Sequence, residues 1–163
     1  ASIIFGPRDG FFNRFATMAQ QAPFLPLVGG GGSLFQPVYV GDVAKAVLRG
    51  LTQPSLGGTT YELGGPEVLS FRVLLERMLA ETGQKAALIP IPFGAASLIG
   101  LFAERLPNPP ITRDQVAMLQ VPNVVGEGAL GLSDLGIEAT PIHAVLPEYM
   151  DVYRRDGRYG TAP

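Results

Sequence analysis

One glycine spacing in the chain is of the kind that binds the phosphates of a dinucleotide. Gly126, Gly128 and Gly131 form a G-x-G-x-x-G motif. Such a motif needs a strand before it, a helix after it and an acidic residue about twenty positions later. Pro141 comes too early for a long first helix, and Glu148, at about the right distance, lies beyond this proline. The context therefore favours an ordinary glycine-rich loop.

Two further polar residues, His143 and Asp42, could act in catalysis or metal binding. His143 is the only histidine and the chain has no cysteine, so neither a metal site nor a nucleophile–histidine pair is supported. Asp42 precedes an apolar segment of helical periodicity, where a carboxylate typically caps the helix. We predict no catalytic residue and no metal site in this chain.

The composition limits the possible classes of function. Of the 163 residues, 47% are hydrophobic and only 16% are charged. A chain of this length can bury one hydrophobic core. Its content of charged residues is low for a soluble domain. We therefore expect part of the apolar surface to belong to an interface. The net charge of −2 gives no basic footprint for nucleic acid. The lack of cysteine excludes disulfides and fits a reducing compartment.

Residues 86–103 form a charge-free stretch whose length requires a check for a membrane span. Pro90 and Pro92 interrupt it, because each removes a backbone donor and clashes with a continuing helix. The remaining residues 93–103 would rise only about 16 Å as a helix, so we expect no transmembrane span. For the apolar helix at 93–106 we favour burial against another layer over a face for a partner or a membrane.

The hydrophobic pattern alternates strands with helices. It predicts strands over 2–5, 37–40, 59–63 and 87–91, and an apolar run over 24–28 that leads into a mobile glycine loop. It predicts helices over 11–22, 42–51, 70–82, 93–106 and 147–155, and a short helix with a capping box of Thr112 and Gln115. Residues 121–140 are expected to be irregular. The fold class is α/β with right-handed crossovers, and we count 1–163 as a single unit.

Two of these helices have a predicted inward face. Asp42 should cap a helix whose apolar face consists of Val43, Ala44, Val47, Leu48 and Leu51. Ser70 should cap the second helix and Gly83 should end it, with an inward face of Phe71, Leu74, Leu75, Met78 and Leu79.

Several segments, taken in their order and spacing, resemble one protein family. They are residues 2–13, 35–46, 61–66 and 112–116, followed by Leu135–Ile137, Thr140–Pro141 and Leu146–Tyr149 near the end of the chain. Together they resemble the second half of the atypical and extended short-chain dehydrogenase/reductase proteins, which are NAD-dependent epimerase/dehydratase-like. Within that family they are most similar to the group related to the nucleotide-binding accessory subunit of respiratory complex I.

The resemblance implies that a missing N-terminal half would supply the phosphate-binding glycine loop and a catalytic Tyr-x-x-x-Lys pair. This chain would supply the last strands of a Rossmann-like parallel sheet and a small mixed α/β C-terminal substrate lobe. It contains no such pair itself, because position 43, four residues after Tyr39, is Val, and no other tyrosine has the lysine either. The chain alone is therefore not expected to be an enzyme.

The resemblance also implies a set of site residues. The backbone of Ser2, Ile3 and Ile4 and the turn at Gly6 and Pro7 would lie beside the nicotinamide of NAD or NADP. Phe11, Phe12, Phe35 and Gln36 would line the substrate pocket. Phe35 stands where nucleotide-sugar epimerases often carry an arginine, and no Lys or Arg lies between Phe15 and Ala44. A diphosphate would need such cations, so a nucleotide-sugar substrate is disfavoured.

Two functions remain open at this point. The first is an accessory or assembly role at NADH dehydrogenase, with the dinucleotide held structurally by the full-length parent. The second is a reductase or epimerase that acts on an apolar small molecule. The expected partners are the missing half, respiratory-complex subunits or a second copy. The expected location is cytoplasmic or peripheral on the inner membrane, and no dinucleotide should bind tightly to this chain alone.

Overall fold

The computed structural model describes residues 1–103 and 113–154, and within them the strands form three two-stranded pieces. β1 (Ile4–Phe5) pairs in parallel with β4 (Val38–Tyr39), and β2 (Phe24–Val28) pairs in parallel with β6 (Ala87–Ile91). β3 (Leu34–Phe35) pairs antiparallel with β5 (Leu69–Ser70). The predicted α/β class with parallel strand pairs is thereby confirmed.

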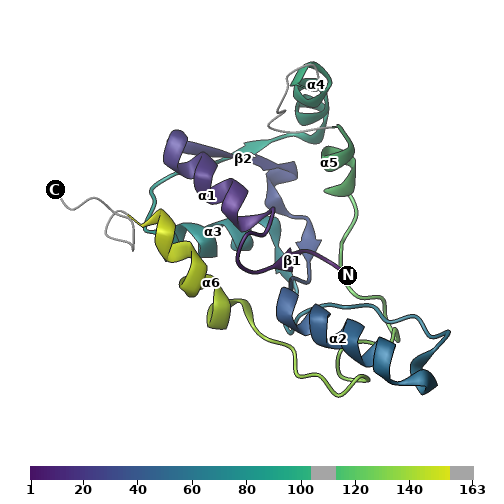
Figure 1. Ribbon diagram of the computed structural model, residues 1–163. Helices are drawn as coiled ribbons and strands as arrows, with labels where there is room; N and C mark the ends of the chain where they lie inside the picture. The colour runs from purple at the N-terminus through teal and green to yellow at the C-terminus, as the bar shows by residue number, and fades with distance from the viewer. Residues whose placement is uncertain (104–112, 155–163) are drawn as a thin grey trace.

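The helices divide into a central group and two outlying ends (Figure 1). The central group is α1 (Phe12–Gln21), α3 (Phe71–Thr82) and α6 (Ile142–Met150). α2 (Val40–Thr52) lies at one end of the molecule, whereas α4 (Phe93–Ala103) and α5 (Arg113–Met118) lie at the opposite end (Figure 1). Short 3-10 turns occupy Gly29–Gly31, Pro54–Leu56 and Asp151–Tyr153.

The main core lies where the central helices meet β1 and β2. Its fully or nearly fully buried members include Phe5, Phe12, Leu25, Leu27, Phe71, Leu74, Leu75, Met78, Leu146 and Met150. A smaller core of Val38, Ala46, Leu132, Leu135 and Ile137 lies beneath α2. The main core therefore joins residues from both ends of the sequence.

α3 forms as the sequence predicts. The hydroxyl of Ser70 accepts a hydrogen bond from the N–H of Val73 at 3.3 Å, and Gly83 ends the helix in the left-handed conformation with φ 65°. Phe71, Leu74, Leu75 and Met78 are buried and Leu79 packs beside them. Capping and periodicity agree at this helix, so the prediction from local signals is confirmed.

α2 begins earlier than predicted and presents its apolar residues to solvent. It starts at Val40, so Asp42 lies in the first turn, and the capping role predicted for its side chain is wrong. Val47, Leu48 and Leu51 are 55%, 60% and 80% exposed. Periodicity identifies an apolar face, but it does not tell whether another element covers that face.

α4 also differs from the expectation of burial. Ala96 is buried, whereas Leu98, Ile99 and Leu101 are 60%, 46% and 40% exposed. Within the described residues no helix is both long enough and apolar enough to cross a membrane. The predicted continuation of this helix to residue 106 and the capping role of Thr112 lie outside the described residues.

Three other segments depart from the sequence prediction. Residues 59–63 form no strand; they run as irregular chain beside residue 130, where Glu62 N–H donates to the Leu130 carbonyl at 2.8 Å. The glycine run at 29–31 is a 3-10 turn rather than an open loop. α6 begins at Ile142, earlier than predicted, and contains Pro147, with Leu146, Tyr149 and Met150 on its buried face. The irregular course of 121–140 is as expected.

Candidate functional site

The turn after β1 lies at the carboxyl end of a parallel strand pair, the edge where α/β sheets bind ligands. Gly6 has φ 151°, and a Cβ at this position would lie 2.6 Å from Cγ1 of Val40 at the start of α2. Arg8 adopts the left-handed conformation with φ 69° and is exposed. Gly6 thus allows the close approach of the turn to α2.

Asp9 organises this turn with both of its carboxylate oxygens. Oδ1 accepts the N–H groups of Phe11 at 2.9 Å and Phe12 at 2.6 Å, at the start of α1. Oδ2 accepts the Gly6 N–H at 3.3 Å and the Tyr149 hydroxyl at 2.6 Å. Sequence reasoning missed this residue, although an aspartate just before a segment of helical periodicity is a capping signal.

Tyr149 connects α6 to the same turn. Burial and the neighbouring Asp9 carboxylate raise the pKa of Tyr149 well above its ordinary value. The phenol therefore remains protonated at neutral pH and donates to Asp9. This arrangement fastens α1 to α6 and provides no general base.

An apolar pocket of about 240 Å³ opens beside this turn, between the residue before β1 and the elements α1, β2, β3, α3 and α5. Its apolar lining comprises Ile3, Phe11, Phe15, Met18, Pro26, Val28, Phe35, Phe71, Met118 and Leu119. The polar side chains of its lining are Arg14, Gln115 and Asn123. None of the described residues in the lining carries a carboxylate.

The structure brings three of the predicted site residues together in this pocket. Ile3, Phe11 and Phe35 all line it. Phe12, which was expected to line it too, is instead fully buried in the main core, where its ring meets Phe5 edge-to-face at 6.4 Å. Ile4 is 42% exposed and Pro7 is exposed at the turn, both outside the pocket lining.

The aromatic wall of the pocket is held by ring-to-ring contacts. Phe11 lies 5.1 Å from Phe15 and 5.9 Å from Phe71, measured between ring centroids. Phe71 in turn lies 5.5 Å from Phe15 and 6.4 Å from Phe35. Edge-to-face aromatic pairs at these spacings are favourable, so the wall is formed before any ligand arrives.

Ser2 and Gln36, also predicted site residues, hold the backbone around residues 123–125. The Ser2 hydroxyl donates to the Asn123 carbonyl at 2.6 Å and accepts the Gln36 N–H at 3.0 Å. The Gln36 side chain donates to the Gly65 carbonyl at 2.9 Å and accepts the Val125 N–H at 2.9 Å. These groups are engaged within the chain, so they position the pocket wall.

Asp42, in the first turn of α2, has a buried side chain with two charge-stabilising partners. Its Oδ1 accepts from the Lys45 ammonium at 2.9 Å, and its Oδ2 accepts the Thr140 N–H at 2.7 Å. Burial opposes ionisation of this carboxyl, but the hydrogen bonds from Lys45 and Thr140 outweigh it and hold the pKa of Asp42 below its ordinary value. The carboxylate therefore fastens residue 140 to α2.

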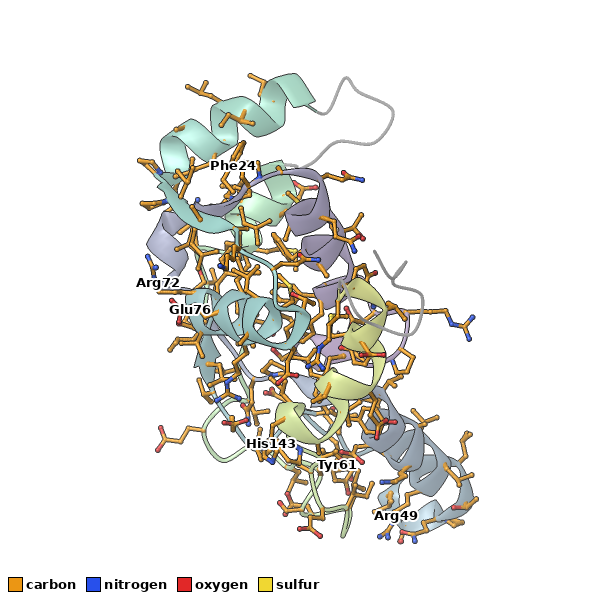
Figure 2. All side chains as sticks on the ribbon, turned by 90° about the vertical axis from the view of Figure 1, so that its left-hand side faces the viewer. Phe24, Arg49, Tyr61, Arg72, Glu76 and His143 are labelled. Carbon is orange, nitrogen blue, oxygen red and sulfur yellow. The ribbon has the colours of Figure 1, made fainter. Side chains whose placement is uncertain are left out.

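The glycine motif and the histidine have no catalytic setting. Gly126 N–H donates to Glu62 Oε2 at 2.8 Å and Gly131 N–H to Asp134 Oδ2 at 2.7 Å, within irregular chain. His143 is exposed at the beginning of α6, as Figure 2 shows. Within residues 1–103 and 113–154, no three His, Asp or Glu side chains are placed to hold a metal ion.

Comparison with known proteins shows clear relatives. No model of a protein family matches the sequence. The chain is 32% identical to NADH dehydrogenase [ubiquinone] 1 alpha subcomplex subunit 9, mitochondrial, from Arabidopsis thaliana, over 96% of this chain and 41% of that protein. The mouse protein of the same name is 32% identical over 97% of this chain and 41% of its own length. The chain thus spans about two fifths of the length of these curated relatives.

Two of the solved structures of similar fold are enzymes named for nucleotide sugars. dTDP-glucose 4,6-dehydratase from Bacillus anthracis, solved with NAD, matches 97% of this chain and 44% of its own with a TM-score of 0.62 at 15% identity. UDP-glucose 4-epimerase from Thermus thermophilus, also solved with NAD, matches 93% of this chain and 44% of its own with a TM-score of 0.58 at 18% identity. These likenesses define the fold alone.

The two comparisons agree with the resemblance found in the sequence. The chain has the fold of the epimerase/dehydratase-like short-chain dehydrogenases/reductases, and its sequence is that of a relative of subunit 9 of NADH dehydrogenase.

Proposed function

We propose that this chain is the C-terminal, substrate-lobe part of an accessory subunit of an NADH dehydrogenase complex. The observation that carries the proposal is the similarity to subunit 9 along nearly the entire chain. The identity is 32% for the plant and mouse proteins and also for the Dictyostelium discoideum protein, which matches 94% of this chain. The missing N-terminal half would cover the exposed apolar face of α2.

We further propose that the full-length parent holds NAD or NADP as a structural group. Solved structures of the same fold contain NAD, and the turn after β1 lies at a ligand-binding edge of the sheet. Ser2, Ile3, Ile4, Gly6 and Pro7 would contribute mostly backbone atoms beside the nicotinamide. The lack of a Tyr-x-x-x-Lys pair in this chain leaves any hydride chemistry to the parent.

The proposed location follows from the same relatives. Their names place them in mitochondria and in NADH dehydrogenase. Of the two locations expected from the sequence, cytoplasmic or peripheral on the inner membrane, we therefore propose the peripheral position on the respiratory membrane. Other subunits of the complex would be the partners of the exposed apolar faces.

A second candidate function is favoured by one observation, the preformed apolar pocket. A reductase or epimerase that acts on an apolar small molecule would use this pocket as its substrate site, with the nicotinamide supplying the hydride chemistry. Such an enzyme would need the Tyr-x-x-x-Lys pair in its N-terminal half. Sequencing the coding region upstream of Ala1 discriminates between the two candidates.

The test of the accessory role is to delete the coding segment for residues 1–163 in the source organism. We expect the amount of assembled NADH dehydrogenase and the NADH oxidation of its membranes to fall, and both to return when the intact gene is restored. Complementation with D9A, which disturbs the turn after β1, should restore them only partly. Normal assembly and normal NADH oxidation after the deletion would contradict the accessory role.

A further inference from the structure

The apolar pocket beside β1 has features of a ligand site that the accessory role does not explain. We propose that it binds a flexible hydrocarbon chain, of the alkyl or prenyl type, and that it excludes nucleotide sugars. This inference concerns the pocket of this chain alone, so it does not depend on whether the chain belongs to a respiratory complex.

The first support is the chemistry of the lining. Four phenylalanine rings, two methionines and several aliphatic side chains form the wall. Arg14 and Gln115 already have interaction partners within the chain. A diphosphate needs cations or free N–H donors, and among the side chains that the structure describes Arg14 is the one cation in the lining. An uncharged apolar group therefore suits the site better than a charged one.

The second support is the size of the pocket. Its volume is about 240 Å³, whereas an engineered apolar cavity of about 150 Å³ binds benzene. A branched or linear hydrocarbon larger than a benzene ring therefore fits. Gly10 adds room at the rim, because no atom lies within 4 Å of where its Cβ would be.

The third support is that the walls cannot readily collapse onto one another. The Asn123 N–H donates to the Leu34 carbonyl at 2.8 Å, and the Asn123 carbonyl accepts from both Ser2 and Gln36. The Ser33 hydroxyl donates to the Leu119 carbonyl, which fixes the end of α5. These bonds fix the backbone on both sides of Phe35 and at the end of α5, so this part of the lining cannot readily move into the pocket.

The fourth support is the position of α5. Met118 lines the pocket and is 66% exposed, while Val116 on the same helix is fully buried against Val28 and Ala96. α5 therefore forms one rim of the pocket, packed against the core through Val116 and exposed to solvent at Met118. A chain that enters past Met118 would reach Met18 and the phenylalanine rings.

The four methionines provide a direct test with a built-in control. Met18 and Met118 line the pocket, whereas Met78 and Met150 are fully buried in the main core. The 163-residue chain, labelled with 13C at its methionine methyl groups, would be titrated with n-octanol, geraniol and UDP-glucose in separate NMR experiments. We expect octanol or geraniol to shift Met18 and Met118 saturably and to leave Met78 and Met150 in place.

Two variants show whether the rim of α5 belongs to the site. Met118→Glu places a charge at the exposed rim and should weaken hydrocarbon binding about fivefold, since it removes apolar contact with the chain. Leu51→Glu makes the same change at an exposed position on α2 and should leave binding unchanged. Octanol and geraniol distinguish a preference for linear chains from one for branched chains.

Three results would overturn the proposal. They are no saturable shift of Met18 with either hydrocarbon, equal shifts of all four methionines, or shifts of Met18 and Met118 with UDP-glucose only. Because the titration measures binding within this chain, its failure leaves the proposed accessory role untouched. If the deletion test contradicted the accessory role, the result of the titration would still hold for the pocket.

Discussion

At the scale of single residues, the carboxylates of Asp9 and Asp42 hold distant parts of the chain together. Asp9 caps α1 and accepts the Tyr149 hydroxyl, and Asp42 fastens Thr140 to α2. Both use buried or partly buried charge to connect residues roughly 100 or more positions apart. Their side chains bind N–H and O–H groups of the chain itself, so each should contribute mainly to stability.

We expect Asp9→Ala to lower the free energy of unfolding by about 2 to 3 kcal/mol, because it removes a helix cap and a hydrogen bond to a buried hydroxyl. Tyr149→Phe, which removes the hydroxyl alone, should cost only about 1 kcal/mol. Urea denaturation measures both changes. Glu148→Ala, at an exposed position of α6, is the control, and an equal effect of D9A and E148A would contradict the assigned role.

A pH dependence follows from Asp42. Its pKa is lower in the folded than in the unfolded chain, so the unfolded state binds more protons as the pH falls. The stabilisation is complete above the unfolded pKa of about 4 and is lost as the pH falls through the folded pKa. The stability difference between the wild type and Asp42→Asn should therefore shrink on acidification below about pH 4. A constant difference from neutral to acid pH would contradict this role.

At the scale of elements, the sequence predicts what local signals control. The cap at Ser70, the inward face of α3 and the stop at Gly83 were all predictable, because each depends on neighbours within a few residues. The exposure of the apolar face of α2 was not predictable, because an apolar stripe in the sequence does not show whether another element covers it. Residues 59–63 read as a strand by composition, but no partner strand pairs with them in the described chain.

The candidate site was predictable only in part for the same reason. Phe11 and Phe35, which the family resemblance predicts in the substrate pocket, both line the apolar pocket, and so does Ile3, which it predicts beside the nicotinamide. The sequence did not predict that α5 lines the pocket. It also did not predict the hydrogen bond between Asp9 and Tyr149, because these residues are 140 positions apart. Contacts between residues this far apart do not change the local hydrophobic periodicity, so the sequence pattern does not predict them.

We expect the exposed apolar stripe of α2 to drive self-association of the isolated chain. Val47, Leu48 and Leu51 are all more than half exposed, and contiguous apolar surface of this kind typically marks an interface. The double variant Leu48→Glu/Leu51→Glu should shift the molar mass by light scattering toward the monomer. Lys85→Glu, away from α2, is the control, and a strictly monomeric wild type at high concentration would contradict the prediction.

At the scale of the whole molecule, the chain spans about two fifths of the length of its curated relatives and leaves apolar surfaces open. The parallel pairs β1–β4 and β2–β6 are short, and parallel strands are usually covered on both faces. Apolar helices lie exposed at the two opposite ends (Figure 1). Phe24 on β2, labelled in Figure 2, is also 50% exposed. These open surfaces account for the low charge of the chain.

The isolated chain should bind NADH and NADPH weakly or not at all. The phosphate-binding loop is expected in the N-terminal half, and the G-x-G-x-x-G at 126–131 is engaged by Glu62 and Asp134. Isothermal titration calorimetry of the 163-residue chain with each dinucleotide is the measurement. Micromolar affinity for either one would show that the lobe carries a complete dinucleotide site of its own.

The central claim is membership of an NADH dehydrogenase complex, and native electrophoresis tests it most directly. The full-length protein would carry a C-terminal tag in its source organism, and membranes would be solubilised with a mild detergent. We predict that the tag comigrates with the band that oxidises NADH in the gel and that complex subunits are recovered with it. A tag found only at the mass of the free protein, with the active band unlabelled, would contradict the account.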